Sequence, residues 1–289
     1  MSSKILFVSI ILTLQISLNA ESSKMQSQMD SSEVLDFNPK IASFCLLQSY
    51  PTLEQEGQES LRFRDNSHLV WNLMKDSTRQ AITQRHQNPF QDSWQNPKLA
   101  DSFATPYPLA NFAKNSDEES SRIRDIAFFS MLYGSNEAEV TQNLKSLFWV
   151  DGTEILFNSK NGAYEALVRV KNRLENLLES HPNFKIYLQN IGGTFKWRKI
   201  ADSNNLSAHS FGIAIDINVA HSRYWLWDLK SNALSNSKAV ATIPLEIIEA
   251  FEEENFIWGG RWWHYDTMHF EYRPEILCYA KEFAKSHNP

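Results

Sequence analysis

SAHSFGIAID, residues 207–216, places a histidine seven residues before an aspartate, with a glycine between them. From 212 to 218, isoleucines alternate with Ala, Asp and Asn, a period of two that is typical of a strand with one buried face. Asp216 then points away from that face. On an unbroken strand His209 would point to the opposite side, because the separation is odd. Gly212 supplies a break or bulge that can turn His209 back toward Asp216.

A second stretch near the C-terminal end carries the same kinds of side chain. In GGRWWHYDTMHFEYRP, residues 259–274, His269 begins an alternating segment and Asp266 precedes it by three residues. Two histidines and one carboxylate are a usual ligand set for catalytic zinc, with water as the fourth ligand. We therefore expect His209, Asp216 and His269 to bind one zinc ion, and Asp266 to be the general base for its water. The alternative is two core histidines with satisfied hydrogen bonds and a buried aspartate that accepts backbone N–H groups.

Hydrophobic periodicity surrounds these stretches with helices. The predicted helices are 116–134, 135–150, 162–180 and 242–258, with a short strand at 184–193 and a last helix from Pro274. We predict an α+β fold, in which a small antiparallel sheet carries the zinc site and is flanked by helices, with a helical and irregular N-terminal part.

Composition divides the chain into four parts. They are a signal peptide at 1–20, a disordered lead-in at 21–34, a helical and irregular region at 35–150 that packs on the catalytic part, with a helix near 68–84, and a catalytic domain at 151–289. The first part has one lysine, an apolar run and a small residue at its end, and it is short for a membrane span, although an uncleaved anchor is the alternative. We expect an exported protein, periplasmic or associated with the cell wall, with no membrane span once the signal is removed.

The charge balance and the cysteines limit the partners and the compartment. Lys and Arg total 28 against 34 acids, so no basic field for nucleic acid is expected. The two cysteines, Cys45 and Cys278, form either one disulfide in an oxidising compartment or two buried thiols.

The two quoted stretches resemble the paired motifs S-x-H-x-x-G-x-A-x-D and acid-x-x-H of zinc peptidases that cleave peptidoglycan stem peptides. That family includes D-alanyl-D-alanine carboxypeptidases and L-alanyl-D-glutamate endopeptidases, and it is grouped with lysostaphin and the hedgehog-type zinc fold. The resemblance extends over about residues 150–280, because GGTFKWRKI and FIWGGRWW also match in order and spacing.

The resemblance implies the zinc ligands and the general base given above. It further implies that Arg198 binds a substrate carboxylate or stabilises the developing oxyanion, that Ser207 hydrogen-bonds the substrate backbone, and that His264 assists at the oxyanion. By pattern alone Arg198 is a surface arginine, and His264 is an orienting or solvated histidine. Glu271, on the same strand face as His269, is expected to fix the imidazole tautomer.

The expected function is hydrolysis of peptidoglycan stem peptides by metal-activated water. A D-alanyl-D-alanine carboxypeptidase is favoured, because Arg198 suits a terminal carboxylate. Many carboxypeptidases of the family have Glu where this chain has Asp266, so an L-alanyl-D-glutamate endopeptidase is the alternative. A non-catalytic wall-binding module that retains zinc is an alternative of another class. The expected partner is the stem peptide, and the protein is expected to be a monomer.

Overall fold

The computed structural model describes residues 37–56, 60–65, 69–72, 97–115, 118–200, 205–231 and 243–287. The predicted signal peptide, the predicted lead-in and most of the helix predicted near 68–84 lie outside these ranges. Residues Phe37–Pro289 group as one compact unit. Within the described residues, none of the helices combines the length and the apolar character needed to cross a membrane.

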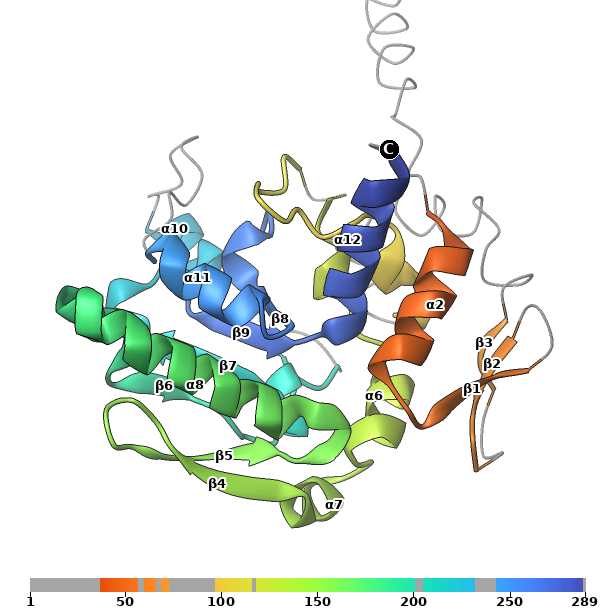
Figure 1. Ribbon diagram of the computed structural model, residues 1–289, viewed down its shortest axis with the longest axis horizontal. Helices are drawn as coiled ribbons and strands as arrows, with labels where there is room; N and C mark the ends of the chain where they lie inside the picture. The colour runs from red at the N-terminus through yellow and green to blue at the C-terminus, as the bar shows by residue number, and fades with distance from the viewer. Residues whose placement is uncertain are drawn as a thin grey trace, which may run out of the picture. The chain divides into compact units, whose positions relative to one another are not determined.

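A four-stranded antiparallel sheet contains part of each quoted stretch (Figure 1). Its strands, in spatial order, are β6 (Ile191–Gly193), β7 (Ala214–Asn218), β9 (His269–Tyr272) and β8 (Phe256–Trp258). Every pairing in it is antiparallel. The prediction of an α+β fold with a small antiparallel sheet is therefore confirmed.

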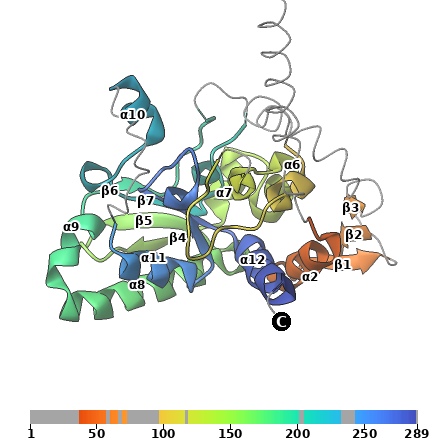
Figure 2. The ribbon, with the colours of Figure 1, turned by 90° about the horizontal axis from the view of Figure 1, so that it is seen from above.

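Two amphipathic helices lie on the same side of this sheet, as Figure 2 shows. They are α8 (Ala163–Ser180) and α11 (Leu245–Glu252). The ring of Phe251 in α11 stacks on Phe270 of β9, with 3.9 Å between the ring centroids. Because Phe270 and the isoleucines of β7 are fully buried, this contact fixes which face of each strand points away from the core.

The N-terminal part contains α2 (Pro39–Ser49) and a separate antiparallel sheet of β1 (Leu53–Glu56), β2 (Ser60–Phe63) and β3 (Leu69–Asn72). The last helix, α12 (Pro274–His287), begins at the predicted residue and packs against α2 (Figure 1). Cys45 and Cys278 form a disulfide between these two helices, so the disulfide alternative is the correct one. Residues 69–72 are a strand and not a helix, because they pair with β2.

The helix predicted over 116–134 is shorter than expected. Within the described residues 118–134, the α-helix covers only Ile126–Tyr133, α6, and follows a 3-10 turn at Ser120–Arg122, η3. The N-cap is Asp125, whose carboxylate accepts a hydrogen bond from the N–H of Phe128 at 3.1 Å. Arg122 and Arg124 therefore lie before the helix, and both of them are buried.

The helix predicted over 135–150 is wrong beyond residue 142. After α7 (Glu137–Gln142) the chain forms a hairpin of β4 (Leu144–Phe148) and β5 (Glu154–Asn158). The turn uses Gly152 at a positive φ of 86°, and the carboxylate of Asp151 accepts a hydrogen bond from Thr153 N–H. The hairpin includes residues 150 and 151, between which the sequence places the domain boundary.

Two other predicted elements each combine a helix with a strand. The segment 184–193 contains a helical turn, α9 (Lys185–Leu188), before β6, and 242–258 contains α11 and then β8. The remaining described elements are η1 (Leu99–Phe103), η4 (Lys160–Gly162), η5 (Pro182–Phe184), η6 (Ala208–Phe211), η7 (Val219–His221), α10 (Trp225–Lys230) and η8 (Gly259–Arg261).

We expect the double substitution Cys45→Ala/Cys278→Ala to lower the free energy of unfolding by about 2–5 kcal/mol, because the disulfide restricts a long loop of the unfolded chain. Urea unfolding followed by tryptophan fluorescence measures this loss. Wild-type protein in a reducing agent should behave like the variant. Equal stability of the oxidised wild type and the variant would contradict the prediction.

Candidate metal centre

Strand pairing brings Asp216 and His269 together. The two residues are direct partners in the register of β7 and β9, so their side chains leave the sheet on the same face. The Nδ1 atom of His269 lies 3.0 Å from Oδ1 of Asp216.

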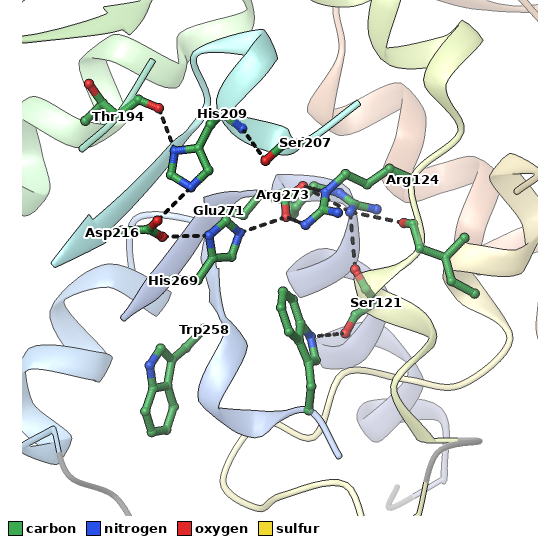
Figure 3. A network of polar contacts seen from close by, with 12 residues as sticks. Ser121, Arg124, Thr194, Ser207, His209, Asp216, Trp258, His269, Glu271 and Arg273 are labelled. Carbon is green, nitrogen blue, oxygen red and sulfur yellow. Dashed lines mark hydrogen bonds and ion pairs between the residues drawn. The ribbon is translucent and has the colours of Figure 1, made fainter. Parts of the chain in front are cut away.

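A 3-10 turn brings His209 to the same point. Ser207 is the N-cap of η6, and Gly212 ends that turn at a positive φ of 65°, where a side chain would be strained. The chain therefore reverses before β7, and His209 Nε2 lies 3.2 Å from Oδ2 of Asp216. Nδ1 of His209 lies 2.6 Å from the carbonyl oxygen of Thr194, which fixes the imidazole ring from behind (Figure 3).

The three side chains form a donor group for a metal ion. One ligand atom from each of His209, Asp216 and His269 lies within 4.8 Å of the others. Zinc bonds to nitrogen and oxygen are about 2.0–2.2 Å long, so tetrahedral ligand atoms are separated by little more than 3 Å. The distances of 3.0 and 3.2 Å from the two imidazole nitrogens to the oxygens of Asp216 are close to this value. Nε2 of His209 is buried, makes no well-aligned hydrogen bond within the described residues, and has the Asp216 carboxylate as its ion-pair neighbour. The donor set therefore fits a divalent metal ion better than it fits two satisfied core histidines.

The electrostatics of the pocket favour positive charge at this point. Burial alone raises the pKa of Asp216, but the imidazoles of His209 and His269 outweigh it and hold the pKa well below its usual value. Burial alone lowers the pKa of His269, but hydrogen bonds to Asp216 and Glu271 outweigh it and raise the pKa to about 9. A metal ion bound here replaces the imidazole proton, so metal binding and protonation compete.

Asp266 lies beside the donor group and is not a member of it. It sits in the loop before β9, held by a hydrogen bond from its N–H to the carbonyl oxygen of Gly259. Its Oδ1 atom is buried and has no hydrogen-bond partner within the described part of the chain. Burial, and then the charge of Asp216, raise the pKa of Asp266 to about 6. A carboxylate with this environment is suited to accept a proton.

The three residues implied only by the resemblance have different surroundings. Ser207 is buried, and its hydroxyl accepts a hydrogen bond from the N–H of His209. Arg198 is exposed, and its backbone is bound to Ser207 and Ser210. His264 is half-buried; its Nδ1 lies 2.5 Å from the carboxylate of Glu119, and its ring packs edge-on against Trp225.

Arg122 is a site residue that the sequence analysis missed. It is buried, donates a hydrogen bond to the carbonyl oxygen of His264 at 3.2 Å, and lies over the ring of Trp262. Burial lowers the pKa of Arg122, and the charges of Glu119 and Asp266 oppose that shift. The pattern gave no local signal for this position, because Arg122 lies within the helix predicted over 116–134 and is not one of its apolar residues.

Tyr224 lies next to Asp266 in the fold and is affected by the charges of Arg122 and Arg198. Its backbone forms a bridge with Asp266. Burial, and to a lesser degree Asp266, raise the pKa of its phenol, whereas Arg122 and Arg198 lower it. The charges of Arg122, Arg198 and Asp266 therefore all act on the phenol of Tyr224.

The fold and the site together define an α+β protein with a candidate centre of two imidazoles and one carboxylate. Residues 201–272, which are 72 of the 289, match the family model described as D-alanyl-D-alanine carboxypeptidase. The match confirms the resemblance to this peptidase family and supports a peptidase that acts on peptidoglycan. Neither the curated proteins nor the solved structures contain a match to this chain.

We expect the purified protein to bind one divalent metal ion per chain, and Asp216→Ala or His269→Ala to weaken that binding at least about 100-fold, because each removes a ligand. Metal content by mass spectrometry and competition with a chromophoric chelator measure the effect. The control is His221→Ala, which removes an exposed histidine close to the end of β7. Unchanged binding in both ligand variants would contradict the metal centre.

Proposed function

We propose that this protein is an exported zinc peptidase that hydrolyses peptidoglycan stem peptides, acting as a D-alanyl-D-alanine carboxypeptidase. The observation that carries the proposal is the convergence of His209, Asp216 and His269 on one point, beside the buried and unpartnered oxygen of Asp266. The family match, which includes all four of these positions and ends three residues after His269, agrees with it.

Zinc is the proposed metal because an imidazole and carboxylate set with an open fourth position is typical of catalytic zinc sites. The ion would be held by Nε2 of His209, Nδ1 of His269 and a carboxylate oxygen of Asp216. When bound, zinc supplies a Lewis acid and a water of lowered pKa. Asp266 is proposed to accept the proton of that water and to pass it to the leaving amine.

The proposed preference for a terminal carboxylate rests on the arginines. Arg198 is exposed, and its charge acts on the phenol of Tyr224, whose backbone is bridged to Asp266; we therefore propose that Arg198 binds an anionic group of the substrate. The shorter acid at Asp266 supports the second candidate, an L-alanyl-D-glutamate endopeptidase. The two activities differ in the bond cleaved and not in the metal centre.

Export is proposed from the signal-like sequence of residues 1–20. The Cys45–Cys278 disulfide supports the same view, because disulfides persist in oxidising compartments. The proposed location is the periplasm or the cell wall, where the substrate is.

We expect Asp266→Asn to retain zinc and to lower turnover of purified muropeptides by about 100-fold or more, because the amide cannot accept the proton. Glu246→Gln, an exposed neutralising change in α11, should leave turnover unchanged. Chromatography of the digest with mass spectrometry measures turnover and identifies the products. An undiminished rate in Asp266→Asn would refute its role as the base.

The masses of the same products decide between the candidate activities. Loss of one D-alanine supports the carboxypeptidase, and an internal cut between L-alanine and D-glutamate supports the endopeptidase. A muropeptide that binds and is never cleaved by the zinc-loaded wild type would refute both and favour a wall-binding module.

A further inference from the structure

The carboxylate of Glu271 lies behind the imidazole of His269. The two residues are on the same face of β9, and Oε2 of Glu271 is 3.4 Å from Nε2 of His269 (Figure 3). The Glu271 side chain is fully buried. Because Nδ1 of the same ring faces Asp216, the contact with Glu271 decides which nitrogen carries the proton and which one is left for a metal ion.

Arg124 holds that carboxylate from the other side. Its Nε donates to Oε1 of Glu271 at 2.6 Å, and its Nη2 donates to Oε2. The Arg124 side chain is only 7% exposed. Two parallel hydrogen bonds from a planar guanidinium fix both the position and the rotation of a carboxylate, which a single ammonium group cannot do.

A second buried arginine orders the segment that carries Arg124. Nη1 of Arg273 donates to the carbonyl oxygens of Ser121 and Ile123, at 3.2 and 3.3 Å (Figure 3). Its Nε donates to Glu275 at 2.5 Å, and Glu275 in turn accepts a hydrogen bond from Tyr50 in the loop after α2. The guanidinium of Arg273, between β9 and α12, therefore holds the backbone of the segment before α6. This gives Arg124 a defined position relative to His269.

We propose that Arg124 is a positioning residue of the metal centre, which acts on His269 through Glu271. The bidentate pair holds the Glu271 carboxylate so that it accepts the N–H of His269 Nε2 and leaves Nδ1 for the metal ion. This inference rests on the metal centre of the proposed function. It adds that a residue outside the matched segment 201–272 sets the affinity of that centre.

The chain offers a matched control for this pair. Arg261 and Glu252 also form a bidentate ion pair, with Nε to Oε1 at 2.5 Å and Nη2 to Oε2 at 2.8 Å. Their side chains are 4% and 13% exposed. The described contacts of this pair are with Tyr107 and Asn111 and not with a proposed metal ligand. A change here tests the general cost of weakening a buried ion pair.

The experiment compares Arg124→Lys with Arg261→Lys in the full chain. We expect Arg124→Lys to weaken zinc binding about 10- to 100-fold and to shift the visible absorption bands of the cobalt-substituted protein, because the lysine keeps the charge and loses the fixed orientation. Arg261→Lys should stay within about twofold of wild type with an unchanged cobalt spectrum. Chelator competition gives the affinities, and circular dichroism confirms that each variant is folded.

Zinc affinity and a cobalt spectrum of Arg124→Lys equal to wild type would overturn the proposal, and so would an equal loss in Arg261→Lys. If Arg124→Lys does not fold, Glu271→Gln replaces it; the same loss of affinity supports the proposal, and unchanged affinity overturns it. A wild type that binds no metal refutes the metal centre itself, and this failure is visible before any variant is measured.

Discussion

The cross-strand pair of Asp216 and His269 is the constraint on which the site depends. A shift of one residue in the register of β7 and β9 would send one of the two side chains into the core. The opposite faces of the same strands prevent that shift, because Ile215, Ile217 and Phe270 are fully buried there. The apolar pattern that folds the sheet is thus the same pattern that assembles two of the three proposed metal ligands.

A second constraint is the charge that the site buries. Asp216, Asp266 and Glu271 bring three carboxylates into one region, and each is close to a buried cationic group. Glu271 is compensated by Arg124, and its pKa is held well below its usual value against the effect of burial. Asp266 has the weakest compensation, because the neighbouring charge of Asp216 adds to its burial. The two carboxylates therefore differ in function: Glu271 stays ionised and supports its neighbours, whereas Asp266 can exchange a proton.

Local sequence patterns predicted the parts of this arrangement that depend on residues close together in the chain. The alternation in β7 and β9, the stripe of α8 and the start of α12 were all visible, and the metal donors followed from residue types on those strands. Strand β4 was predicted as part of a helix because its residues are exposed or half-buried and do not alternate regularly, so their apolar spacing also fits a helix. Arg122 and Arg124 were missed because α6 begins only at Ile126: Arg122 ends the 3-10 turn η3, Arg124 lies between that turn and the helix, and both side chains are buried.

The remaining parts of the site depend on contacts between residues far apart in the chain. Glu119 contacts His264 across 145 positions, and Arg124 contacts Glu271 across 147. Both pairs join the segment before α6 to the segment that supplies Asp266 and His269. No local spacing encodes such pairs, and the matched family segment begins only at residue 201. Removing the early segment would take the bidentate partner from the buried carboxylate of Glu271 and the carboxylate partner from His264, beside the candidate metal site. Glu119 and Arg124 thus contact residues of the candidate site from the N-terminal side of the boundary expected near residue 150.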